Sequence, residues 1–326
     1  MLSRVAETLY WLGRYAERAE DTARLVNVNA HLLLDLPRGL APGWRPLVAI
    51  TGSEDVFQAR YPDYEERHVV RFLIGDRDYP SSVLASLRMV RENARTIRDI
   101  VPREVWELVN ALYLDAQEHV STGLSKRGRH AYLSRIIRGA QTLAGMLDGT
   151  MSHDVGYEFL RIGRNLERAD MTTRIIDVRS ADLLAQADTE LRPFENIQWM
   201  SVLKSLTAYQ MYRRTMQVRV RRSDALRFLL QDQAFPRAFY HCVVAAETGI
   251  AGLPRPERAA RVTAHLKRQA QQADVRGLAD DATALHAFVD QLQVGLGRLH
   301  EAIAGTWFPG ADEAAEAPVV AAQSMG

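Results

Sequence analysis

The chain has 326 residues, of which 47% are hydrophobic and 25% charged, a composition that excludes a disordered or collagen-like protein. Its 41 basic and 40 acidic residues leave a formal net charge of +1, so it lacks the strong basic field of a nucleic-acid-binding protein. The single cysteine, Cys242, excludes an intramolecular disulfide and any site with several cysteine ligands.

The N-terminal residues mix acidic and basic side chains, unlike a signal peptide. No apolar run approaches the ~18 residues that a transmembrane helix needs. We therefore expect a cytoplasmic protein that does not span a membrane.

The first predicted element is a long amphipathic helix, because apolar or small residues recur at alternating steps of four and three from Val5 to Leu33. Residues 35–46 follow as a predicted loop, and residues 47–62 fit no single pattern. Further helices are predicted over 64–75, 82–100, 103–121, 129–148, 153–184, 196–220, 236–250, 257–272 and 278–304. The alternation typical of strands is scarce, so the sequence predicts an all-α fold.

Three motifs recur in the same order along the chain. Gly13-Arg14 with Glu17-Arg18-Ala19 returns 150 residues later, and the stretches that begin at Phe72 and His130 each return 156 residues later. Ordered recurrence predicts a tandem duplication, and hence an antiparallel helical bundle with two pseudo-symmetric halves. The predicted parts are a first repeat over 1–151, a second repeat over 152–308 and a flexible C-terminal tail over 309–326.

The first helix carries a charged ridge about 90° around from its apolar seam, and the second copy carries the same ridge. A glycine in each ridge predicts close approach of another helix, with the charges at its border. The candidate polar site comprises Glu17, Arg18, Glu20, Arg24, Glu167, Arg168, Asp170 and Arg174. These residues either line a polar cleft or form structural ion pairs, such as Glu20 with Arg24 four residues on.

Two aspartates, Asp76 and Asp232, each precede an aromatic-proline pair. They are predicted to be turn or cap residues, with the proline setting the first turn of the next helix. After Pro236 the second copy has Arg237 where the first has Ser81. Arg237 is therefore a candidate for a specialised polar site.

Four arginines follow one face of the helix predicted over 82–100, at steps of three, four and three. They are Arg88, Arg91, Arg95 and Arg98. Together with Arg237 they are candidates for binding an anion or a protein partner, since guanidinium groups pair with phosphates and carboxylates. The alternative is a solvated or salt-bridged helix face.

Searches for known reaction motifs find none, so the catalytic residues are unknown. Glu65 and His68 form one Glu-x-x-His pair, whereas a di-iron bundle uses two with two further glutamates. There is no glycine-rich phosphate loop and no nucleophile elbow. We predict no metal and no cofactor, and a buried, unreactive Cys242.

The opening residues Met1-Leu2-Ser3-Arg4 and the stretch from Leu9 to Glu20, Leu-Tyr-Trp-Leu-Gly-Arg-Tyr-Ala-Glu-Arg-Ala-Glu, resemble the bacterial alpha-E domain family. The stretch from Gly163 to Asp170, Arg91 to Arg95 and Phe235-Pro236-Arg237 are also similar to that family. The resemblance covers nearly the whole chain.

The resemblance implies a genomic context. Such proteins are typically encoded beside, or fused to, a circularly permuted ATP-grasp-type carboxylate-amine ligase. We therefore expect a helical partner of that ligase, possessing no nucleotide-binding motif of its own, that shapes the ligase site or holds a peptide substrate. The alternative is a stand-alone peptide-modifying or amide-hydrolysing enzyme that uses the same Glu and Arg residues. Either hypothesis is compatible with a homo-oligomer.

Overall fold

The computed structural model describes residues 3–35, 43–185, 195–216 and 219–308, the side chains of 180–185 excepted. Every element of regular structure within these ranges is a helix, so the predicted all-α class is confirmed. None of the described helices combines the length and apolar character needed to cross a membrane.

The helices before residue 152 are α1 (Ser3–Asp35), α2 (Arg45–Ile50), α3 (Glu54–Gln58), α4 (Glu66–Val70), the π-helix η1 (Arg71–Gly75), α5 (Val83–Thr96), α6 (Arg103–Glu118), α7 (Val120–Leu124) and α8 (Arg129–Thr150). Those after it are α9 (Val155–Ala185), α10 (Glu195–Ser205), α11 (Tyr209–Thr215), α12 (Arg222–Gln231), α13 (Phe239–Ala251), α14 (Glu257–Gln272), α15 (Val275–Asp280) and α16 (Ala282–Trp307).

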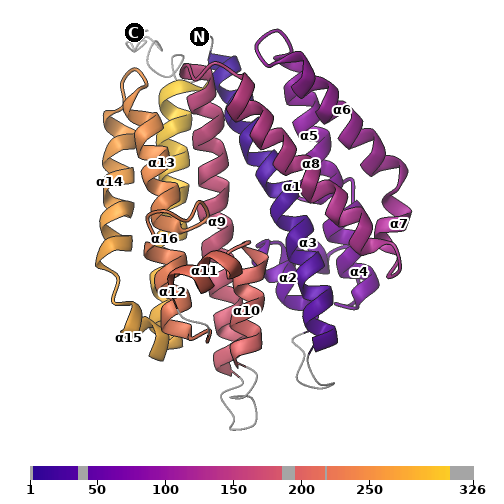
Figure 1. Cartoon of the computed structure of the whole chain (residues 1–326), viewed down its shortest axis with the longest axis vertical. Coiled ribbons are helices and arrows are strands. Elements are labelled where there is room, and N and C mark those ends of the chain that lie inside the picture. Colours follow the sequence, from indigo (N-terminus) through magenta and orange to yellow (C-terminus); the bar gives the residue numbers. More distant parts are fainter. Residues whose placement is uncertain (1–2, 36–42, 186–194, 217–218, 309–326) are drawn as a thin grey trace, which may run out of the picture.

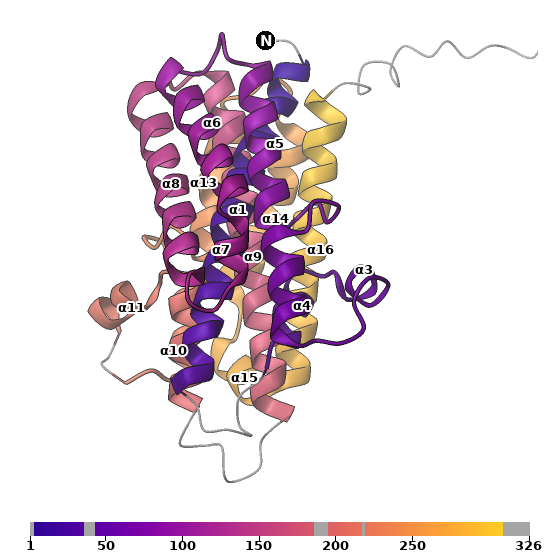
Figure 2. The ribbon, with the colours of Figure 1, turned by 90° about the vertical axis from the view of Figure 1, so that its right-hand side faces the viewer.

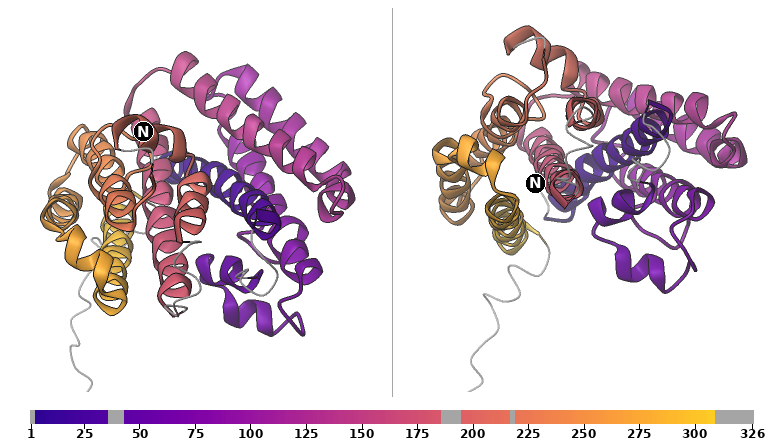
Figure 3. Two further views of the ribbon diagram at one scale, coloured as in Figure 1. Left: turned by 60° about the horizontal axis from the view of Figure 1, so that its bottom comes forward. Right: turned by 90° about the horizontal axis from the view of Figure 1, so that it is seen from below.

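Two long helices, α1 and α9, lie side by side at the centre of the molecule (Figure 1). The remaining helices of each half flank this pair, as the perpendicular view and the views from below also show (Figures 2 and 3). Short elements cross over: α2 packs against α9, and α10 packs against α1. The two halves therefore share one continuous hydrophobic core, to which both contribute.

The central pair, α1 and α9, runs parallel, whereas the sequence predicted an antiparallel bundle. Arg18 of α1 bonds Glu167 of α9, and further along Arg179 bonds Asn29. The flanking helices α8 and α13 do run antiparallel to their central neighbour. Whether the two halves arose by duplication remains a prediction, as do its boundaries at 151 and 308.

The apolar seam predicted for the first helix faces the core. Leu9, Leu12, Ala19, Ala23 and Val26 on α1 have no exposed surface. Burial of such side chains stabilises the fold by about 1.5–3 kcal/mol for each leucine or valine. The seam therefore holds α1 inside the molecule and turns its charged ridge toward α9.

Some predicted helices are shorter or broken. The helix expected over 196–220 is interrupted between α10 and α11, where Thr207 has a positive φ of 56° that no α-helix accommodates. The helix expected over 278–304 breaks at Asp281, whose carboxylate accepts the Thr283 and Ala284 backbone N–H groups and caps α16. The helix expected over 82–100 ends at Thr96.

Residues 47–62, for which the sequence predicted no single structure, contain most of α2 and all of α3. Helix α2 begins at Arg45, inside the loop predicted over 35–46. Most of that loop, residues 36–42, and the predicted tail 309–326 lie outside the described residues.

Both predicted turn aspartates cap turns. The Asp76 carboxylate accepts the backbone N–H groups of Asp78 and Tyr79, and that of Asp232 accepts those of Ala234 and Phe235. The second turn delivers the chain to the start of α13, beside α9.

Candidate functional site: a buried charged interface between α1 and α9

The two ridge glycines form the closest contact between the central helices. A Cβ atom on Gly13 would lie 2.3 Å from the Leu160 carbonyl oxygen, and one on Gly163 would lie 2.1 Å from that of Tyr10. Both distances are far inside van der Waals contact, and the obstructing atoms belong to the backbone. Glycine is therefore required at both positions, and the backbones approach closely enough for charged side chains on either side to meet.

On one side of this contact, Glu167 of α9 accepts hydrogen bonds from two arginines of α1. Its carboxylate lies 2.6 Å from Arg14 Nε, and 2.5 Å and 2.9 Å from Arg18 Nε and Nη2. Burial by itself would raise the pKa of Glu167, but Arg18 and Arg14 outweigh it and lower the pKa to about 2. Glu167 is therefore charged near neutral pH and joins the two helices through its ion pairs.

On the other side of the contact, an arginine of α9 pairs with a glutamate of α1. Arg168 Nε of α9 lies 2.9 Å from the Glu17 carboxylate of α1. Glu17-Arg18 and Glu167-Arg168 thus pair reciprocally across the interface. The ridge residues that the sequence singled out form interhelical ion pairs.

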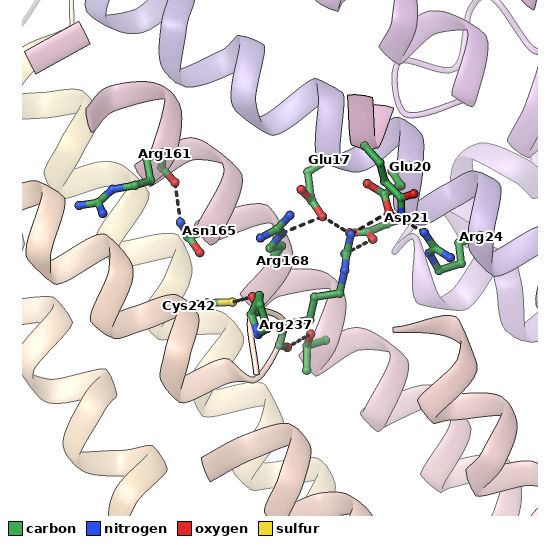
Figure 4. Close-up of polar contacts among 12 residues, drawn as sticks. Glu17, Glu20, Asp21, Arg24, Arg161, Asn165, Arg168, Arg237 and Cys242 are labelled. Atoms are coloured by element: carbon green, nitrogen blue, oxygen red, sulfur yellow. Dashed lines mark hydrogen bonds and ion pairs between the residues drawn. The ribbon is translucent and has the colours of Figure 1, made fainter. Parts of the chain in front are cut away.

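The segment just before α13 adds a third partner, Arg237, to the Glu17 side of the contact (Figure 4). Arg237 reaches between the helices, with Nη2 2.5 Å from Glu17 and 3.1 Å from Glu20, while Nη1 donates to Asp21. The Thr172 hydroxyl of α9 donates to the Arg237 carbonyl oxygen at 2.8 Å and holds the backbone in place. One buried guanidinium therefore serves three carboxylates.

Asp21 is incompletely satisfied in this cluster. It is only 1% exposed, and its Oδ2 atom has no hydrogen-bond partner within the described structure. Burial, with the like charges of Glu17 and Glu20 also acting, raises the pKa of Asp21 to about 8 despite the attraction of Arg237. For Glu17, burial is outweighed by Arg168 and Arg237, which lower its pKa.

The outer candidates pair within their own helices. Arg24 Nη2 lies 2.6 Å from Glu20, and Arg174 Nε lies 2.8 Å from Asp170, each four residues apart. These are the intrahelical supports that the sequence left open as an alternative. All eight candidates of the polar site thus take part in ion pairs.

The other four arginine candidates are placed elsewhere. Arg88, Arg91 and Arg95 lie on α5, whereas Arg98 lies in the turn after it, because the helix ends at Thr96 and the predicted four-arginine face is cut short. Arg91 bridges α5 and α6: its Nε donates to Asn110 Oδ1 at 2.7 Å and its guanidinium lies over the Trp106 and Tyr113 rings. Arg95 pairs with Glu92 on its own helix. Arg88 and Arg98 are exposed. Of the five anion-site candidates, Arg237 alone joins the charged interface.

Sequence reasoning missed an aromatic extension of the interface. Arg14 also donates to the Tyr10 hydroxyl at 3.0 Å, and that hydroxyl lies 2.9 Å from His300 Nδ1 of α16. Burial, followed by the charge of Arg14, lowers the pKa of His300. No local motif marks Tyr10 and His300 as partners.

A buried pair further along the helices, Asn29 with Arg179, was also missed. Asn29 and Arg179 are 150 residues apart in the sequence, as are Gly13 and Gly163. The recurrence at an offset of 150 residues could therefore have predicted that these two side chains meet.

The three glutamates of the interface are almost entirely buried. Glu17, Glu20 and Glu167 are each 3% exposed. Cys242 is also buried nearby, and burial raises the pKa of its thiol to about 12, which keeps it protonated and unreactive. No cluster of potential metal ligands occurs among the described residues. The arrangement ties α1, α9 and the segment before α13 together.

Comparison of the chain with known protein families gives a match. Residues 1–308 match the model of Alpha-E, described as a predicted alpha-helical domain with a conserved ER motif. Two of the Glu-Arg dipeptides of this chain, at 17–18 and 167–168, are set against each other by the fold. No solved structure matches the chain.

Similar curated proteins come from mycobacteria. The uncharacterized proteins Mb2597 of Mycobacterium bovis and MT2643 of Mycobacterium tuberculosis are 30% identical to the chain over 193 residues, and Rv2567 of Mycobacterium tuberculosis is 29% identical. The match covers 53% of this chain and 22% of each relative, so the chain spans only a small part of their length. With its family match over residues 1–308, the chain belongs to the Alpha-E family.

Proposed function

We propose that the chain is a helical partner of an ATP-grasp-type carboxylate-amine ligase and supports formation of an amide or peptide bond. The observation that carries this proposal is that the Glu-Arg pairs of α1 and α9 are buried against one another. Because the strongest polar candidates hold the helices together, the outer helical surfaces remain for binding the ligase or its peptide substrate.

The relatives add support for a helical unit that works with other modules. The matching region makes up 22% of each mycobacterial protein, so there it is joined to much additional chain. The identity of the partner as an ATP-grasp-type ligase comes from the family resemblance alone. The experiment therefore tests whether the chain binds that ligase.

The test is co-expression of the tagged chain with the ATP-grasp ligase encoded in the same genome. We expect the two to co-purify, and the ligase to form more product, or a different product, when the chain is present. Absence of a complex together with unchanged product would contradict the proposal.

The rival, a stand-alone amide-hydrolysing or peptide-modifying enzyme, needs a substrate to reach the buried glutamates. The variant Glu17→Gln/Glu167→Gln separates the two hypotheses. Loss of turnover by an isolated, still folded variant would favour the enzyme, whereas loss of folding or of ligase binding alone would favour the partner role. Arg103→Gln, at an exposed pair on α6, is the matched control.

A further inference from the structure

A groove of about 490 Å³ runs between α14 and α16, on the outer face of the second half. Its floor includes Val262 and Val294, the latter 47% exposed, and Gly295, against which the Leu266 side chain packs. The volume lies within the range of small-molecule sites. The groove is thus large enough for an organic ligand and partly apolar.

The positive charges of the groove gather toward one end. Arg258 and Arg261 lie on one face of α14, and Arg298 lies across from them on α16. The helices are antiparallel, since Leu266 meets Gly295 and Arg258 meets Gly305. Arg298 is therefore opposite residues 263–265, within about one turn of Arg261.

These three guanidinium groups have no ion-pair partner among the described residues. Arg14, Arg18, Arg168 and Arg237 at the central interface, in contrast, are all paired. The only carboxylate in the groove lining, Asp290, lies toward the opposite end.

Gln269 also lines the groove, but its Oε1 atom is shielded from solvent. The exposed arginines therefore supply the polar contacts that a ligand in the groove can reach.

We propose that this groove binds an organic phosphate. A phosphate monoester carries about −1.5 to −2 charge near pH 7 and three acceptor oxygens, which suits three unpaired guanidinium groups better than a single carboxylate does. Its organic part lies over Val262 and Val294. This inference does not depend on the ligase partnership.

The test uses phenyl phosphate as the probe, with isothermal titration calorimetry on the full chain. We expect binding that weakens with added salt, and at least about tenfold weaker binding to the variant Arg261→Gln/Arg298→Gln. Val294→Asp, at an exposed floor position, should weaken binding similarly. The matched control is Arg88→Gln/Arg98→Gln, two exposed arginines of the other half, with affinity unchanged.

Several results would overturn the proposal. One is no heat of binding at about 10 mM phenyl phosphate, and another is equal affinity for the wild type and the Arg261→Gln/Arg298→Gln variant. Inorganic phosphate binding as tightly as phenyl phosphate would remove the role of the apolar floor. A pentaglutamate peptide binding more tightly at the same arginines would make the groove a protein-docking surface instead.

Discussion

Glu167 and Asp21 lie on opposite sides of the same helix contact and are almost equally buried, yet their pKa values shift in opposite directions. Glu167 has two arginines to itself and its pKa falls to about 2. Asp21 shares Arg237 with two other carboxylates and its pKa rises to about 8. Both carboxylates are removed from water, so the number of cations available to each decides the direction.

The difference between the two sides traces to two positions. The residue 150 places after Asp21 is Met171, and the residue 156 places before Arg237, at the offset of the later recurring motifs, is Ser81. The additional acid and the additional arginine therefore occur on the same side of the α1–α9 contact. That side gains a link to α13, and it also gains a carboxylate whose charge is poorly compensated.

The largest effect is expected for Glu167→Gln. Removing this charge leaves Arg14 and Arg18 without their anion in a buried site, a loss of about 3–5 kcal/mol in the free energy of unfolding. Urea unfolding at pH 7 measures it. A loss below about 1 kcal/mol would show that the two arginines find other partners or water.

The second prediction concerns the close approach of the α1 and α9 backbones, which allows the ion pairs to form. Gly13→Ala and Gly163→Ala are each expected to destabilise by about 1–3 kcal/mol, because their Cβ atoms would collide with backbone. Gly145→Ala on α8, where a Cβ meets nothing, is the control and should stabilise by up to about 1 kcal/mol. Equal behaviour of all three variants in thermal unfolding would refute the close contact.

The third effect is a pH dependence of opposite sign on the two sides. The raised pKa of Asp21 favours folding below about pH 4, and this contribution is lost as the pH rises toward 8. The lowered pKa of Glu167 contributes stability above about pH 4 that is lost as the pH falls toward 2.

Asp21→Asn should therefore gain stability relative to the wild type between pH 4 and 8, by at most about 1.4 kcal/mol per pH unit. Urea unfolding at a series of pH values measures this difference. A constant difference across that range would mean that Asp21 is ionised throughout.

The smallest effect is expected at the surface. Arg103 and Glu107 on α6 form an exposed pair at 2.8 Å. Arg103→Gln should change the unfolding free energy by less than about 0.5 kcal/mol. A larger change there would mean that the interface variants report general sensitivity to charge rather than burial.

The fold class and most helix positions could be predicted because helical periodicity and turn residues are local. The expected helix over 257–272 coincides with α14, and the two aspartates cap turns as predicted. The break at Thr207 could not be predicted, since the periodic pattern continues through it.

The sequence by itself determined which side chains share a ridge, because the 3.6-residue period orients each residue about its helix. Only the tertiary structure decided that Glu17 faces Arg168, that Glu167 faces Arg14 and Arg18, and that Arg237 joins them from 216 residues beyond Asp21. Such pairings depend on which helices pack together, and that is settled by burial of the whole core rather than by any local pattern.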